Sequence, residues 1–96
     1  MALTGKQKHQ LRALAHKLKP VVLIGANGLT EAVLNELDEQ FKIHELIKVK
    51  IPGSDRTQRQ VMLDKICDHC EAQWVQNIGH IGIFYRAFDQ PVIQLN

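Results

Sequence analysis

A short run of apolar residues, Val21 to Ile24, constrains the fold of this chain more than any other feature. The run is mostly β-branched and ends at Gly25, a pattern typical of a strand that is buried on both faces. The next residues, Gly25-Ala26-Asn27-Gly28, form a glycine loop, and Thr30 can then cap a helix. We therefore expect a buried strand that leads through a glycine loop into a helix.

A helix and a second strand are predicted directly after this loop. Glu31 lies in the expected first turn, and the helical pattern continues to about Lys42. The segment from Glu45 to Ile51 alternates between apolar and polar residues, as a strand does. Two strands joined through a helix run parallel, so this part of the chain should form a β-α-β unit. The residues expected to bury the helix are Val33, Leu34, Leu37 and Phe41.

Another helix is predicted before this unit. Thr4 and Gln7 have the spacing of a capping box, and Lys19-Pro20 stops the helical pattern. Apolar residues recur between these limits at helical spacing, so one side of the helix should face the core. These residues are Leu11, Leu14, Ala15 and Leu18.

A third helix and two strands are predicted after the unit. Pro52-Gly53 breaks the chain, and either Ser54 or Asp55 can cap a helix that reaches about Ala72. Two strands, Trp74 to Ile78 and Ile81 to Arg86, then follow around a Gly79-His80 turn. The apolar residues of the helix are Met62, Leu63, Ile66, Cys67 and Cys70, and the aromatic residues expected in the core are Trp74, Phe84 and Tyr85.

These elements define the expected fold class. Their order is α-β-α-β-α-β-β, and one four-stranded mixed sheet packed with helices buries all of their apolar residues. A chain of 96 residues has room for one hydrophobic core. We therefore predict an α/β fold with a single compact domain that spans residues 1–96.

Charge is distributed unevenly along the chain. The net charge is +5 over residues 1–20, −4 over 21–47 and +3 over 48–60. Two basic blocks separated by an acidic one can fold into one positive and one negative face, which is the charge distribution expected of a polyanion-binding protein. The alternative is ordinary solvated surface charge.

The basic residues have spacings that bring them together. Lys8 and Arg12 lie four residues apart on the first helix, with His16 next on the same line. Lys48 and Lys50 alternate with apolar residues, so both should lie on one side of their strand. The candidate binding residues outside the glycine loop are Lys8, Arg12, Lys17, Lys19, Lys48, Lys50, Arg56 and Arg59.

The glycine loop is a candidate phosphate-binding site. Gly25 and Gly28 carry no Cβ, so a phosphate can approach the backbone closely near the start of the next helix. The loop lacks the third glycine of a dinucleotide fingerprint and the Gly-Lys-Ser/Thr of a triphosphate loop, so nucleotide cofactors are disfavoured. A GxxG loop also clamps the nucleic-acid backbone in KH domains, but there the loop joins two helices, whereas here it joins a strand to a helix. The alternative is a simple turn, since Asn27-Gly28 is a common turn dipeptide.

No candidate catalytic or metal centre is evident. Cys67 and Cys70 lie late in a predicted helix on its apolar side, so we expect them to pack in the core rather than bind zinc or act as a redox pair. The histidines are scattered, and no nucleophile, base and acid can be grouped. We therefore expect neither enzymatic activity nor a cofactor or small-molecule substrate.

The expected location is the cytoplasm. The first ten residues lack the apolar segment of a signal peptide, and Val21 to Ile24 is far too short to cross a membrane. Two cysteines on one helix also suit a reducing compartment.

The chain resembles the CRM domain family, named for chloroplast RNA splicing and ribosome maturation, in its bacterial single-domain YhbY-like form. The resemblance is carried by the stretch from Leu18 to Thr30, by His44 to Lys50, by Ile78-Gly79-His80 and by Tyr85-Arg86. Together these segments extend over nearly the whole chain, and their order and spacing make the resemblance specific.

The resemblance implies a fold similar to the C-terminal domain of translation initiation factor three. It also implies non-catalytic RNA binding and association with precursors of the large ribosomal subunit, with ribosomal RNA as the partner. Gly25, Ala26, Asn27 and Gly28 correspond to the family's GxxG loop; neither central residue is basic, so attraction must come from Lys17, Lys19 and nearby basic residues. The alternative function is a protein-interaction adaptor on a ribosomal or RNA-processing particle that makes no direct RNA contact.

Overall fold

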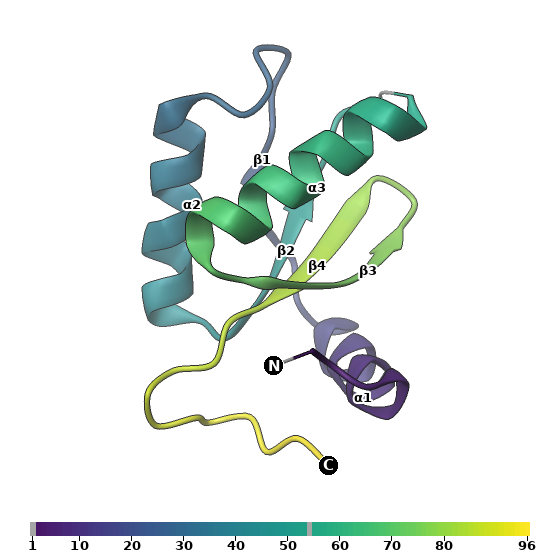
Figure 1. Cartoon of the computed structure of the whole chain (residues 1–96), viewed down its shortest axis with the longest axis vertical. Helices are drawn as coiled ribbons and strands as arrows, with labels where there is room; N and C mark the ends of the chain where they lie inside the picture. The colour runs from purple at the N-terminus through teal and green to yellow at the C-terminus, as the bar shows by residue number, and fades with distance from the viewer. Residues whose placement is uncertain (1, 54) are drawn as a thin grey trace.

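The structure, a computed structural model, describes residues 2–53 and 55–96. It is an α/β domain in which helices cover both faces of a four-stranded sheet (Figure 1). The predicted order of elements is confirmed. The elements are α1 (Gly5–Ala15), β1 (Pro20–Leu23), α2 (Glu31–Ile43), β2 (Leu46–Lys50), α3 (Arg56–Cys70), β3 (Gln73–Ile78) and β4 (Ile81–Tyr85).

The sheet is mixed, as predicted, and its strand order is β1-β2-β4-β3. β1 runs parallel to β2, which confirms the β-α-β unit, and β4 runs antiparallel to both of its neighbours. Gly79, with a φ of 58°, makes the turn between β3 and β4. Gly82 in β4 is required for packing, because a Cβ there would lie 2.9 Å from the Phe84 ring and 3.0 Å from Ile51.

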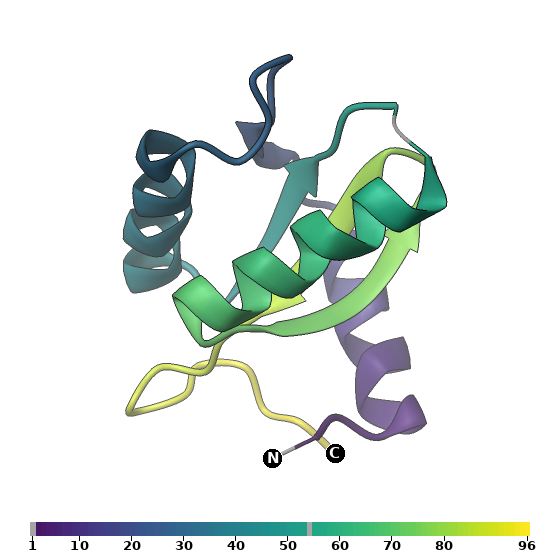
Figure 2. The same ribbon diagram turned by 45° about the horizontal axis from the view of Figure 1, so that its top comes forward.

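The helices form two layers that enclose two parts of the core (Figure 2). α2 and α3 cover one face of the sheet, where Leu37, Phe41 and Ile66 are fully buried. α1 packs on the other face through Leu11 and Ala15. Successive side chains of β2 point to opposite layers. Ile47, Val49 and the following Ile51 face α2 and α3, whereas Leu46 faces α1.

Side-chain caps define the start of each helix. Thr4 and Gln7 form the predicted capping box, and the Thr30 hydroxyl accepts a hydrogen bond from the backbone N–H of Val33. Asp55 caps α3 by accepting a hydrogen bond from the N–H of Gln58. The alternative cap, Ser54, lies outside the described residues.

The first helix is shorter than predicted, and two of its expected core residues are exposed. α1 ends at Ala15 rather than at Lys19, and Leu14 and Leu18 are 46% and 40% exposed. Once the helix ends, Leu18 no longer lies on the side that Leu11 and Ala15 present to the sheet. The prediction of a core face was therefore correct for Leu11 and Ala15 but wrong for Leu14 and Leu18.

The first strand is also less buried than predicted. Val22 and Ile24 are in the core, but Val21 is 38% and Leu23 is 64% exposed. β1 is an edge strand, and the described contacts of α1 are with the other three strands. The α1 side of β1 is therefore open to solvent, so the prediction of a strand buried on both faces was wrong.

The cysteines and two of the three aromatic residues pack as expected. Cys70 is 1% exposed, and Cys67 is half-buried against the same cluster. Phe84 and Tyr85 are buried, whereas Trp74 is 38% exposed and was wrongly predicted to be a core residue. Its strand, β3, is the second edge of the sheet.

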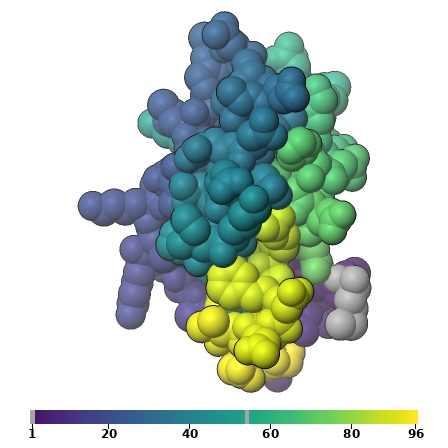
Figure 3. All heavy atoms as spheres, turned by 90° about the vertical axis from the view of Figure 1, so that its left-hand side faces the viewer, coloured from purple at the N-terminus to yellow at the C-terminus, as the bar shows by residue number. Residues whose placement is uncertain are grey.

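The segment after β4 is held to the domain by a buried carboxylate. Glu45 is 4% exposed and accepts hydrogen bonds from the backbone N–H groups of Phe88, Val92 and Ile93, at 2.7 to 2.9 Å. This segment, yellow in Figure 3, therefore packs beneath α2 and returns toward α1. Arg86 is bound to Asp38 at 2.9 Å and to the carbonyl oxygen of Cys70, so it connects the middle of α2 to the end of α3.

No helix within residues 2–53 and 55–96 is long and apolar enough to cross a membrane.

Candidate nucleic-acid interface

The glycine loop protrudes between β1 and α2 as a tight turn (Figure 1). The N–H of Gly28 donates a hydrogen bond of 3.0 Å to the carbonyl oxygen of Gly25, and the N–H of Thr30 donates one to Gly28. Gly28 has a φ of 72°, in the left-handed region that favours glycine. Ala26 and Asn27 are both exposed at the tip.

Gly25 is not needed to make this turn. Its φ lies outside the left-handed region, and a Cβ added there would meet no atom within 4 Å. The fold therefore accounts for Gly28 but leaves Gly25 with an open approach to its backbone. A ligand that packs against this backbone would benefit from the missing side chain.

A first basic group lies between α1 and the sheet. Arg12 and His16 of α1 and Lys48 of β2 line one cavity of about 520 Å³, and His9 lines it as well. The Lys48 ammonium donates a hydrogen bond of 3.0 Å to the carbonyl oxygen of Leu18. This group brings together residues that lie more than thirty positions apart, so a short polyanion segment could contact them all.

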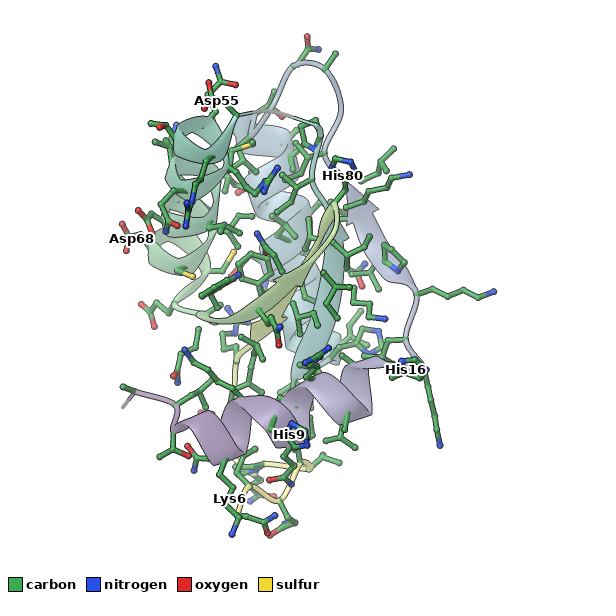
Figure 4. All side chains as sticks on the ribbon, turned by 90° about the vertical axis from the view of Figure 1, so that its right-hand side faces the viewer. Lys6, His9, His16, Asp55, Asp68 and His80 are labelled. Carbon is green, nitrogen blue, oxygen red and sulfur yellow. The ribbon has the colours of Figure 1, made fainter. Side chains whose placement is uncertain are left out.

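Three further predicted lysines belong to this side of the molecule. Lys50 is exposed and lies two residues after Lys48, on the same side of β2. Lys17 and Lys19 are exposed in the segment between α1 and β1. Figure 4 shows His16 at the end of α1 where this segment begins, whereas Lys6 projects away from the sheet.

The remaining predicted residues form a second basic group around Trp74. The Lys8 ammonium lies 5.6 Å from the centroid of the Trp74 ring, and Arg56 and Arg59 line a small cavity of about 180 Å³ with the same tryptophan. α3 covers the opposite face of the sheet from Lys48. The predicted basic residues therefore form two groups rather than one positive face. Lys8 lies one helical turn before Arg12, as predicted, but its ammonium lies against Trp74.

Two residues near these groups were not predicted from the sequence. His9 lies three residues before Arg12 and seven before His16, so helical spacing could have placed it beside them. Trp74 gave no such signal, because its position beside Lys8 and Arg56 depends on how α1 and α3 pack around the edge strand.

The described residues offer no metal centre, since no three His, Cys, Asp or Glu side chains among them are grouped to hold a metal ion. The two cysteine thiols are also poorly disposed to ionise. Burial raises the pKa of Cys70 to about 11, and burial raises the pKa of Cys67 as well. Neither thiol is therefore activated as a nucleophile at neutral pH.

Taken together, the fold and these groups define a class of small α/β domain with a protruding glycine loop and basic side chains on both layers. The model of the CRS1 / YhbY (CRM) domain matches residues 3–86. The chain therefore belongs to the CRM domain family.

Several bacterial relatives are similar over most of their length. An RNA-binding protein of Haemophilus influenzae is 48% identical over 97% of this chain and 94% of its own. A probable RNA-binding protein of Pseudomonas aeruginosa is 44% identical over 95% of this chain and 88% of its own. The solution structure of a Staphylococcus aureus protein matches 99% of this chain and 100% of its own, with a TM-score of 0.85 and 31% identity.

Proposed function

We propose that this protein binds RNA and assists assembly of the large ribosomal subunit. The glycine loop from Gly25 to Gly28 holds the RNA backbone, and the two basic groups supply the attraction. The protein acts in the cytoplasm by binding rather than by catalysis, with ribosomal RNA in a large-subunit precursor as its partner.

The cavity between α1 and β2 carries this proposal. Arg12 and Lys48 converge there from two layers of the fold, with His16 beside them, and clustered cations on one surface favour a polyanion. The second basic group, with Lys8, Arg56 and Arg59, lies beyond the edge strand and can contact another part of a folded RNA. Membership of a family whose relatives are described as RNA-binding proteins supports the choice of RNA.

The decisive experiment is crosslinking of the protein to RNA in cells, followed by sequencing of the attached RNA. We expect the sequences to map to ribosomal RNA of the large subunit and the protein to sediment with its precursors. Contacts spread evenly over messenger and transfer RNA would contradict the assignment to ribosome assembly, while leaving RNA binding intact.

A protein-interaction adaptor is the second candidate, and one observation favours it. Leu14, Leu18, Ile43 and Val92 are all at least 40% exposed and line one groove of about 320 Å³. Exposed apolar groups of this kind often mark protein contacts. Association with ribosomal particles that survives complete nuclease digestion would favour the adaptor, whereas release on digestion favours direct RNA binding.

A further inference from the structure

The glycine loop also forms one wall of a cavity that the proposed backbone contacts do not use. This cavity has a volume of about 440 Å³ and lies between the loop and the N-terminal half of α3. Gly25 and Gly28 line it on the loop side, and Thr57, Gln58 and Val61 line it on the helix side. Figure 2 shows the loop and the start of α3 at the same end of the molecule, where Figure 4 also places Asp55.

The lining of this cavity is neutral and mostly apolar. No charged residue among those that the structure describes lines it, and Val61 is 56% exposed although it lies within α3. Polar side chains are supplied by Thr57 and Gln58, which can donate and accept hydrogen bonds. An apolar cavity with a few polar groups suits a flat, neutral molecule whose edge carries hydrogen-bonding atoms.

We propose that this cavity holds an unpaired nucleobase of the RNA whose phosphate lies on the glycine loop. The inference rests on the proposed function and specifies its ligand as single-stranded or bulged RNA. Val61 contacts the face of the base, and Thr57 and Gln58 bind its edge. A base inside a continuous A-form duplex is stacked and paired, so it could not enter.

The charges around the cavity favour a nucleotide over an apolar peptide. α2 begins at Glu31, three residues beyond Gly28, and α3 begins at Arg56, beside Thr57. The N-termini of both helices therefore lie near the loop. Glu31 and Asp55 add a carboxylate at each, but the remaining backbone N–H groups of these first turns can still bind a phosphate. A neutral cavity beside such N–H groups matches the two halves of a nucleotide, whereas an apolar side chain would use only the cavity.

The test compares affinities for three RNAs by fluorescence anisotropy. They are a short single strand, the same strand with one abasic nucleotide at each position in turn, and a duplex of the same sequence. The wild-type protein should bind the intact strand about ten-fold more tightly than the strand that is abasic at the preferred position, because the base buries apolar surface on Val61 and forms hydrogen bonds with Thr57 and Gln58. It should also prefer the strand to the duplex.

Two matched variants assign this preference to the cavity. Val61→Asn should bind the intact and abasic strands with nearly equal affinity. Val92→Asn makes the same change at a valine that is 73% exposed in the C-terminal segment, and it should behave as wild type. If Val61→Asn does not fold, as judged by its melting curve, Val61→Thr supplies the same comparison with a smaller change in shape.

The possible outcomes separate the two proposals. Equal wild-type affinity for the intact strand and every abasic strand would overturn the nucleobase site but leave backbone binding intact. Retention of the preference by folded Val61→Asn and Val61→Thr would also overturn the site. Failure to bind any of the RNAs would overturn the proposed function together with the site.

Discussion

The Lys48 ammonium donates a hydrogen bond of 3.0 Å to the carbonyl oxygen of Leu18. This bond connects β2 to the segment between α1 and β1, so Lys48 has a structural role besides its charge. Lys50 lies on the same side of β2 and is exposed, and its replacement leaves this bond intact. Lys50 is therefore the cleaner position at which to test the basic group.

Replacement of Lys50 by glutamate should weaken binding to all RNA sequences alike, because a phosphate contact carries no base information. If wild type neutralises about four phosphates, the slope of log affinity against log salt concentration should be roughly −3, and it should become less steep in the variant. Lys65→Glu, at an exposed position of α3, is the control. A flat salt response in the wild-type protein would rule out electrostatic binding.

Two aspartates at the tip of the glycine loop should weaken RNA binding without harming the fold. In the double variant Ala26→Asp and Asn27→Asp, the new carboxylates repel a phosphate. They also compete with it for the backbone N–H groups of the loop and of the start of α2. We expect a loss of about ten-fold in affinity, or about 1.4 kcal/mol, and an unchanged melting temperature, because both positions are exposed. Unchanged affinity in the folded variant would mean that the loop only connects β1 to α2.

The two glycines of the loop should respond differently to alanine. Gly28→Ala places a Cβ at a φ of 72° and should lower the free energy of unfolding by about 1 to 2 kcal/mol. Gly25→Ala adds a methyl group that contacts no atom and causes no backbone strain, so the stability of this variant should equal that of wild type. Its RNA affinity should fall several-fold. Gly5→Ala, which also adds a methyl group into open space, should keep its affinity. Full RNA affinity of Gly25→Ala would argue against a close approach of the ligand.

Buried thiols should make the stability of the protein fall at alkaline pH. Burial raises the pKa of Cys70 from 9.0 to about 11, so the folded state resists ionisation that the unfolded state permits. The stabilising contribution is complete below pH 9 and is lost as the pH rises toward 11. Urea unfolding at several pH values should show a smaller alkaline loss when Cys67 and Cys70 are both alanine.

The same double variant tests the packing role of the cysteines. It should lose about 1 to 3 kcal/mol of stability at neutral pH, because buried side chains are shortened, while RNA binding is retained at a temperature where it remains folded. Tight zinc binding by the wild-type protein that disappears in this variant would show that the cysteines are metal ligands instead.

The carboxylate of Glu45 should control the docking of the C-terminal segment. Glu45→Gln removes the charge of the carboxylate that accepts hydrogen bonds from three backbone N–H groups. It should lower the free energy of unfolding by about 1 to 3 kcal/mol. Hydrogen exchange of the amides of Phe88, Val92 and Ile93 should become faster. Glu39→Gln disrupts only an exposed ion pair with Lys42 and should change little. Equal effects of the two variants would contradict this role for Glu45.

Local sequence determined the order of the elements and most of their ends. Thr30 and Asp55 cap helices because their side-chain oxygens accept hydrogen bonds from N–H groups three residues ahead, a relationship that depends only on nearby residues. The alternation of β2 likewise placed Lys48 and Lys50 on one side of the strand. The sequence alone also predicted the glycine loop between β1 and α2.

The burial of side chains depended on which elements pack together. Leu14, Leu18 and Leu23 are apolar in the right pattern, yet they are exposed. Leu18 lies beyond the end of α1, Leu23 lies on an edge strand, and Leu14 lies within α1 but lines an open groove. Periodicity identifies the apolar side of an element but not whether another element covers it.

Only the tertiary structure decided how the basic residues are grouped. Spacing placed Lys8 one turn before Arg12, but β3 brings Trp74 to Lys8, while Arg12 joins Lys48 on the side of the sheet that α1 covers. The tertiary structure also placed Val61 of α3 across a cavity from the glycine loop, although Val61 lies thirty-three residues after Gly28 in the chain. Such contacts join residues distant in sequence, and they form because packing the sheet between its helix layers buries the apolar surface of every layer at once.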